Sequence, residues 1–175
     1  EKMCTKAVDT SLEPVGAWVG MRGSRVQAVV NELQGEKIDI VNWSEDPAIL
    51  VSNSLSPAEV QRVNVDVERK KLDVILTEEN LSKAIGRRGQ NVRLATKLMD
   101  YEIDILTESE ESEKRQAEFK DKTEIFVKNL ELDETLGQLL VAEGFSSVED
   151  IKQSTLEDIV KIEGIDKNTA KELKE

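Results

Sequence analysis

The apolar residues of the first 107 positions follow one pattern twice. In the second copy they recur at the i, i+3, i+4 spacing of a helix face and predict two helices, through Leu81, Ala84 and Ile85 and then through Val92, Ala95, Leu98 and Met99. The first copy has the same pattern 66 residues earlier, with Val19 at the place of Ile85 and Val26 at that of Val92. Each copy ends in Ile-Asp-Ile, at residues 38–40 and 103–105, which predicts a strand. We name the two copies the first repeat and the second repeat.

The residues ahead of the second pair of helices predict further elements. Residues 63–67 and 72–76 are rich in β-branched and apolar side chains around a polar turn, which is typical of a strand hairpin. Residues 47–55 predict a helix that ends at Ser56-Pro57. The first repeat has room for a single strand, about residues 2–8, before its first helix. We therefore expect the first repeat to lack one helix and one strand, and residue 1 not to be the natural start of the protein.

The chain changes character after residue 107. Residues 108–122 are rich in Glu, Ser and Lys and predict a polar acidic linker or helix. Residues 123–175 return to short amphipathic segments and predict four or five short helices, two of which start with the spacing of a capping box, Ser147 with Asp150 and Thr155 with Asp158. Ile162-Glu-Gly-Ile165 resembles the turn of a helix-hairpin-helix. The predicted domains are residues 1–41, 42–107, the linker 108–122, and 123–175.

Composition narrows the function classes. Of the 175 residues 38% are hydrophobic and 34% charged, and no apolar run approaches the roughly eighteen residues of a membrane span. The chain has one cysteine and no histidine, so the usual zinc ligands and the commonest general base are missing. We expect a cytoplasmic protein that is not an enzyme, holds no metal or cofactor, and has no membrane partner.

The net charge of −12 is unevenly distributed. Residues 1–107 carry 14 basic and 17 acidic side chains, whereas residues 108–175 carry 10 and 19. No acidic residue lies between Glu13 and Glu32, or between Glu79 and Asp100. These two intervals contain the two turns between the predicted helices, so a basic face on an acidic protein is expected.

Each repeat places Gly-x-Arg-Gly between its two helices, as Gly20-Met21-Arg22-Gly23 and as Gly86-Arg87-Arg88-Gly89. Glycine permits positive φ and close approach of another backbone, and the following helix start supplies unpaired N–H groups, so the turn suits a sugar-phosphate chain. Arginines of the turns can pair with phosphate oxygens. The remaining candidate site residues are Ser24, Arg25, Lys83, Gln90, Asn91, Arg93 and Lys97.

The glycine turn between two helices with flanking strands resembles the KH domain of RNA-binding proteins, in the bacterial (type II) arrangement. Two in tandem, with the strings GMRGSRVQAVVNEL and AIGRRGQNVRLA, resemble the NusA family of transcription termination and antitermination factors. The resemblance implies an α+β fold: two tandem type II KH domains, the first N-terminally truncated, followed by a small all-α helix-hairpin-helix-like domain. It also implies that both turns clamp nascent single-stranded RNA, with about four nucleotides per domain and one continuous track.

The same resemblance implies partners in the transcription machinery. The acidic tail would contact RNA polymerase, through the C-terminal domain of its α subunit, or another antitermination factor, or mask the chain's own KH surface; the chain itself is expected to be a monomer. Two other interpretations remain open: a protein-interaction scaffold with incidental RNA contact, and a DNA-repair accessory that uses the hairpin near Gly164. Because the second turn has Arg87 where the first has Met21, the second is the better candidate for the stronger phosphate contact.

Overall fold

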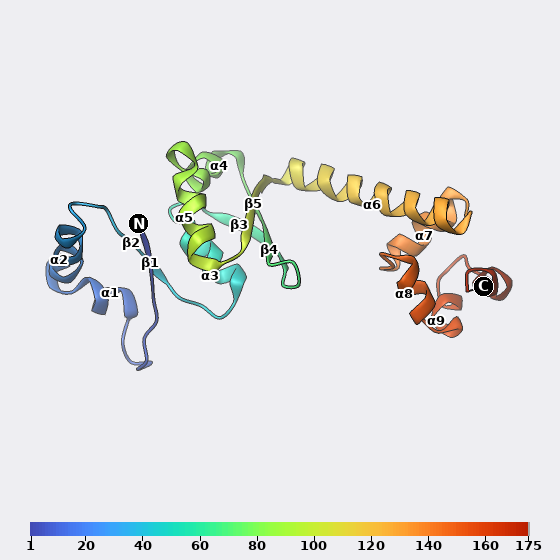
Figure 1. The fold of residues 1–175 in the computed structure, drawn as a ribbon, viewed down its shortest axis with the longest axis horizontal. Helices are drawn as coiled ribbons and strands as arrows, with labels where there is room; N and C mark the ends of the chain where they lie inside the picture. Colours follow the sequence, from blue (N-terminus) through green and yellow to red (C-terminus); the bar gives the residue numbers. More distant parts are fainter. Residues whose placement is uncertain (175) are drawn as a thin grey trace. The chain divides into compact units, whose positions relative to one another are not determined.

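The chain folds into two compact units, residues 1–111 and 112–175, in a computed structural model that describes residues 1–174 (Figure 1). The first unit is α+β and holds both repeats, and the second is all α. Among the described residues, no helix is long and apolar enough to cross a membrane.

The second repeat contains the helices and strands expected from its sequence. Its three-stranded sheet has the order β3-β4-β5, with β3 antiparallel and β5 parallel to β4. The elements are α3 (Pro47–Ser54), β3 (Val60–Asp66), β4 (Lys71–Leu76), α4 (Glu78–Ile85), the 3-10 turn η2 (Arg87–Gly89), α5 (Gln90–Met99) and β5 (Glu102–Thr107). The hairpin β3–β4 and the helix pair α4–α5 confirm the sequence predictions for this repeat.

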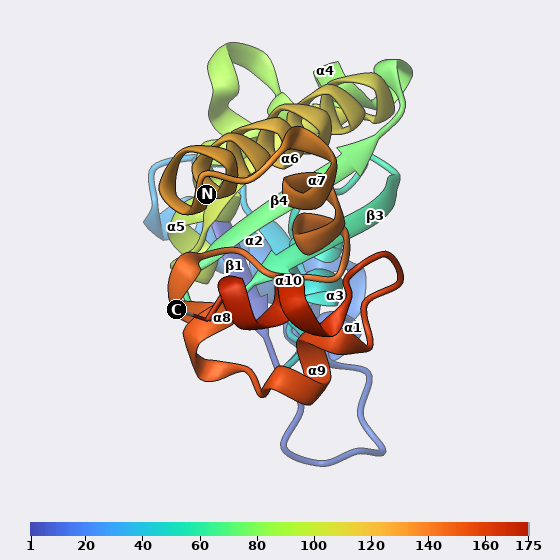
Figure 2. The ribbon, with the colours of Figure 1, turned by 90° about the vertical axis from the view of Figure 1, so that its right-hand side faces the viewer.

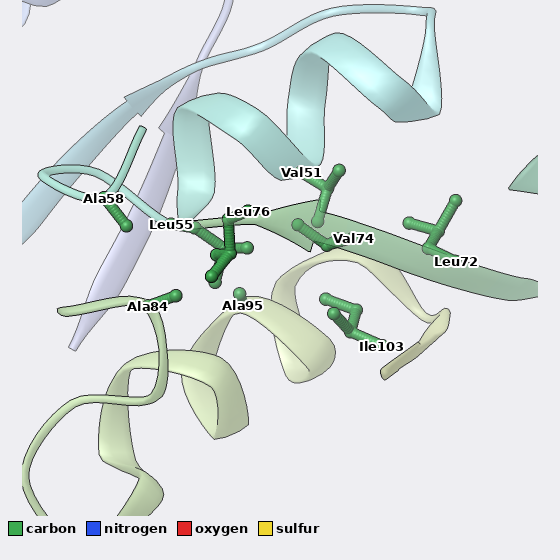
Figure 3. Close-up of a cluster of buried hydrophobic side chains, with 9 residues drawn as sticks. All are labelled: Val51, Leu55, Ala58, Leu72, Val74, Leu76, Ala84, Ala95 and Ile103. Atoms are coloured by element: carbon green, nitrogen blue, oxygen red, sulfur yellow. The ribbon is translucent and has the colours of Figure 1, made fainter. Parts of the chain in front are cut away.

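Figure 3 shows the core of the second repeat, which lies between α3, the sheet and the pair α4–α5. Leu72, Val74 and Leu76 of β4 are fully buried, and so are Ala84 and Ala95 of the two helices. The small alanine side chains let both helices approach α3 and the sheet closely. This packing fixes the ends of α4 and α5, and therefore the turn between them.

The first repeat has the same order of elements from its first strand onward. They are β1 (Lys2–Thr5), α1 (Pro14–Val19), the 3-10 turn η1 (Met21–Gly23), α2 (Ser24–Glu32) and β2 (Asp39–Asn42), with β1 parallel to β2. The first strand is shorter than the predicted 2–8, because its partner β2 ends opposite Thr5 and the chain turns at Asp9, whose Oδ1 accepts hydrogen bonds from Ser11.

The first repeat is more open than the second. The positions that correspond to Ala84 and Ala95 are Trp18 and Val29, and both line a hollow of about 940 Å³. In the second repeat the corresponding space is filled by α3.

The second unit contains most of one long helix, α6, followed by short helices, which Figure 2 shows at the C-terminal end of the chain. The elements are α6 (Glu108–Leu130), α7 (Glu134–Ala142), α8 (Val148–Gln153), α9 (Leu156–Val160) and α10 (Lys167–Glu172). The segment 108–122 lies inside α6. Both predicted capping boxes are present, at the starts of α8 and α9. The core of this unit includes Phe126, Leu140, Ile151 and Ile159, all fully buried.

Candidate nucleic-acid interface

The two glycine-bracketed turns have the same backbone conformation. Gly20 and Gly86 have φ of 75° with ψ of 176° and 173°, and Gly23 and Gly89 have φ of 76° and 71°. Arg22 and Arg88, at the third position, have φ of 53° and 55°. Positive φ costs a non-glycine residue on the order of 1 kcal/mol or more, and such costs are concentrated at functional sites. The duplication therefore extends from the sequence to the dihedral angles.

The first glycine of each turn is required by both conformation and space. Its combination of positive φ with extended ψ is one that essentially only glycine adopts. A Cβ on Gly86 would lie 2.6 Å from Cβ and 2.9 Å from the backbone N of Asn91, and a Cβ on Gly20 would lie 2.8 Å from Cγ of Arg25. The chain can therefore reverse between the helices only because the side chain is missing.

Arg25 and Asn91 occupy equivalent positions and both reach back to the preceding helix. Arg25 Nη1 donates to the carbonyl of Ala17. Asn91 Nδ2 lies 3.3 Å from the carbonyl oxygen of Leu55, 3.2 Å from that of Lys83 and 3.1 Å from that of Ala84. These contacts hold the two helices of each repeat at a fixed distance. Both residues therefore act in positioning the turn, and their contact with RNA stays a prediction.

The second glycine of each turn leads directly into a helix. Gly23 and Gly89 adopt the left-handed conformation, and α2 and α5 begin at the next residues, Ser24 and Gln90, which are exposed. In residues 1–174, no side chain caps the start of either helix. The N–H groups of Ser24 and Gln90 are not unpaired as expected, because they donate to the carbonyls of Met21 and Arg87 within the turns. What the start of each helix offers an anion is the positive end of its dipole.

The second turn is the more basic of the two. Arg87, Arg88, Gln90 and Arg93 line a hollow of about 500 Å³. Within the described part of the chain, none of these arginines pairs with a carboxylate. In the first turn Met21 replaces one arginine and is 85% exposed. The second turn thus offers two adjacent guanidinium groups where the first offers one.

A groove of about 530 Å³ joins the two repeats. Its apolar wall comes from α1, α2 and β2 of the first repeat, and its polar side comes from both repeats. Apolar lining residues include Val15, Val19, Val26, Ile38 and Ile40, and polar ones include Lys2, Lys37, Asn53, Lys83 and Asn91. The apolar wall can accept nucleobases, and the exposed Lys37 and Lys83 can pair with phosphates.

A smaller hollow of about 210 Å³ connects this groove with the second turn. Gly86, Arg87 and Gln90 line it from the second repeat, and Lys37 and Asp39 line it from the first. Lys37 and Asp39 also line the larger groove. The groove of the first repeat and the turn of the second are therefore contiguous.

The structure places the predicted site residues in two groups, one at each turn. Ser24 and Gln90 directly follow the two turns, and Arg93 lies one helical turn further along α5. Lys83 lines the groove that joins the repeats. Lys97 lies in the last turn of α5, about 12 Å along the helix from Gly89. The sequence analysis did not identify Lys2 and Lys37 as groove residues. Lys37 could have been found, because it directly precedes the repeated Ile-Asp-Ile motif.

The structure also describes the residues that could bind a metal. Among residues 1–174, no group of three or more His, Cys, Asp or Glu side chains is placed to hold a metal ion. Cys4 lies in β1 and is partly buried, and this burial raises the pKa of its thiol.

Comparisons with known proteins match both repeats. A family model described as NusA-like first KH domain matches residues 1–43, and one described as NusA-like second KH domain matches residues 47–113. The chain is 48% identical over 176 residues to the transcription termination/antitermination protein NusA of Rickettsia prowazekii (strain Madrid E) and to that of Rickettsia conorii (strain ATCC VR-613 / Malish 7). These alignments cover 99% of the chain and 35% of each relative, so the chain spans about one third of their length.

One solved structure, described as the crystal structure of APE1850, is also similar. It has 24% sequence identity and a TM-score of 0.44, and the match covers 53% of this chain and 70% of that one. The family models and the curated relatives, rather than this structure, identify the two repeats.

Proposed function

The chain belongs to the NusA family through its two KH domains, and from that premise we propose that it holds single-stranded RNA across both repeats as part of a transcription termination and antitermination factor. The observation that carries the proposal is the duplicated turn. Two turns agree in φ to within 5° at each glycine, and each opens an uncapped helix next to an exposed arginine. A structure needed only to connect two helices would not require this charge twice.

The proposed mechanism is electrostatic and positional. Phosphates of the RNA backbone lie at the positive ends of the dipoles of α2 and α5, while Arg22, Arg87 and Arg88 pair with their oxygens. The missing Cβ atoms of the turn glycines let the RNA backbone approach closely. Each turn clamps about four nucleotides, as expected of a KH domain. Affinity should therefore fall as salt rises.

The contiguous groove supports one track rather than two separate sites. Lys83 of the second repeat and Lys37 of the first line the same groove, and Lys37 also lies beside the turn at Gly86. A strand leaving the first turn can follow these lysines to the second. RNA held in this way near a transcribing polymerase would change how readily hairpins form in the transcript, which is how we propose that the chain acts. We propose no enzymatic reaction.

The helical second unit is proposed to bind protein rather than RNA. Residues 108–175 carry 19 acidic and 10 basic side chains, so the segment repels phosphate. Near the hairpin at Gly164, Glu163 and Asp166 are exposed. A basic surface of the transcription machinery, such as the C-terminal domain of the RNA polymerase α subunit or another antitermination factor, fits this charge. The proposed setting is the cytoplasm, with the chain as a monomer.

Fluorescence anisotropy with a labelled 12-nucleotide single-stranded RNA tests the RNA-binding proposal. Replacing Arg87 and Arg88 by aspartate should weaken binding at least about tenfold, because two phosphate pairs of about 1 kcal/mol or more are replaced by repulsion. Replacing Lys167 and Lys171 by aspartate is the matched control, since it changes the charge equally at two exposed positions on α10 of the second unit. We expect this control to bind within about twofold of the parent chain.

Two results would contradict the proposal. Equal affinity of the parent and the Arg87/Arg88 variant would favour a protein-interaction scaffold. Stronger binding to duplex DNA than to single-stranded RNA would favour a DNA-repair accessory. Deleting residues 108–175 should leave RNA affinity equal or higher, and a marked loss would place RNA contacts in the second unit.

A further inference from the structure

A lysine is buried in the groove between the repeats. The side chain of Lys2, on β1, is only 2% exposed, and its Nζ lies 3.4 Å from Oδ2 of Asp39 on the neighbouring strand β2. The carboxylate of Asp39 is 51% exposed. Both residues line the groove of about 530 Å³. The pair thus places a desolvated ammonium group beside a carboxylate that faces open space.

The second repeat carries a similar pair with a different geometry. Asp104 of the second Ile-Asp-Ile pairs with Lys71 at 2.8 Å, and their side chains are 38% and 32% exposed. A charge-assisted N–H to O bond normally measures about 2.7–2.9 Å, so the bond in the second repeat is of ordinary length and the one in the first is long. An ammonium group carries three N–H donors. Asp39 is open to a third group from the groove, and the long bond lets the ammonium group of Lys2 turn from its buried position to donate to that group as well.

The surroundings of the pair suit a nucleobase. Val19, Val26 and Ile40 line the same groove and provide an apolar surface for the face of a base. Asp39 also lines the smaller hollow that includes Gly86 and Arg87. A nucleotide that passes from the first repeat to the second turn would therefore present its base edge to Lys2 and Asp39.

We propose that Lys2 and Asp39 form a base-reading position that selects guanine in the bound RNA; this inference rests on the RNA binding proposed above. Guanine has two adjacent donors, N1–H and the N2 amino group, beside the acceptor O6. A carboxylate accepts hydrogen bonds from both donors, and the ammonium group donates to O6. Adenine, cytosine and uracil each offer the carboxylate a single donor group on that edge. The pair therefore favours guanine over the other three bases.

The test is a selection from a randomised 12-nucleotide RNA pool. The RNAs that the parent chain selects should share a guanine at one constant position when they are aligned. Replacing that guanine by inosine removes the N2 amino group, and we expect the parent to bind the inosine RNA about tenfold more weakly, within the range for loss of a bidentate pair. For Asp39→Asn the two RNAs should differ less than about twofold, and Lys2→Met should also lose the enriched guanine.

The second repeat supplies matched controls. Asp104→Asn and Lys71→Met make the same chemical changes in the pair outside the groove, and both variants should retain the parent's preference for guanine over inosine. Melting curves from circular dichroism verify that each variant is folded. The proposal is wrong if the parent enriches no fixed guanine, or if Asp39→Asn discriminates as the parent does.

A failure of the base-reading proposal can be told apart from a failure of the RNA-binding proposal. If the parent binds RNA and loses affinity in the Arg87→Asp/Arg88→Asp variant, but selects no guanine, then RNA binding stands and base reading by Lys2 and Asp39 falls. If that variant binds as the parent does, the proposed function falls, and the base-reading proposal falls with it.

Discussion

Replacing Gly86 by alanine should destabilise the first unit much more than replacing Gly89, although the two glycines belong to one turn. Both have positive φ, of 75° and 71°. Gly86 combines it with ψ of 173°, a region essentially closed to other residues, whereas Gly89 lies in the left-handed region with ψ of 16°. A Cβ at position 86 would overlap the backbone N of Asn91 at 2.9 Å, and one at position 89 meets nothing within 4 Å.

These geometries give different costs. For Gly89→Ala, the left-handed conformation costs about 1–2 kcal/mol. For Gly86→Ala, the closed region costs up to about 3 kcal/mol and the overlap adds about 1–3 kcal/mol, since a backbone atom of α5 must move. We therefore expect Gly86→Ala to lower the free energy of unfolding by at least about 2 kcal/mol more than Gly89→Ala does. Gly20→Ala should lie between the two, because its Cβ meets the flexible side chain of Arg25.

Urea titration followed by circular dichroism measures these differences, with amide spectra to assign the transition to the first unit. Equal destabilisation by Gly86→Ala and Gly89→Ala would refute the argument, because it would mean that neither ψ nor the approach of Asn91 matters. RNA affinity gives an independent readout: Gly89→Ala should weaken binding despite its small stability cost, since its methyl group occupies the space offered to the RNA backbone.

Three further predictions concern Asn91, the salt dependence and the second unit. Asn91→Ala should lower the free energy of unfolding by about 1–3 kcal/mol, because the carbonyls of Lys83 and Ala84 lose the donor that ties α5 to α4. Gln90→Ala should change it by less than about 0.5 kcal/mol in the same titration. The logarithm of RNA affinity should fall linearly with the logarithm of salt concentration. Arg88→Ala should make this slope shallower by about 0.7 for each phosphate pair that it removes. An unchanged slope would argue against pairing of Arg88 with phosphate. The pKa of Asp158 is lowered because its carboxylate accepts a hydrogen bond from the hydroxyl of Thr155, so its stabilising effect is present above the unfolded value near 4 and is lost as pH falls through the lowered value. Thr155→Val should raise this pKa, as carboxyl chemical shifts followed against pH will show.

Local pattern was sufficient to predict the elements of the repeats. The helix pairs follow from apolar spacing, and the turn follows from two glycines that must adopt positive φ. The capping boxes at Ser147 and Thr155 were predictable because both partners lie within four residues of each other. In each case the interaction that decides the structure is local in sequence.

The roles of several side chains could not be predicted in this way. Asn91 was a candidate RNA ligand, but Nδ2 instead contacts carbonyl groups up to 36 residues away, which only the packing of α3 against α5 brings near. Lys2 is the second residue and was expected to lie in a strand, yet its side chain is buried in the groove that joins the repeats. The segment 108–122 lies in a continuous helix, because mixed charges tolerate helix and Glu110 accepts a hydrogen bond from the backbone N–H of Thr107.

The central claim is that both glycine turns contact the RNA backbone, and the most direct measurement is the amide spectrum of the chain during titration with a 12-nucleotide single-stranded RNA. The account predicts that the amide signals of Gly23, Ser24, Gly89 and Gln90 shift together and saturate with the binding curve, while those of α8 and α9 do not move. Unshifted signals at both turns, with RNA still bound, would contradict it.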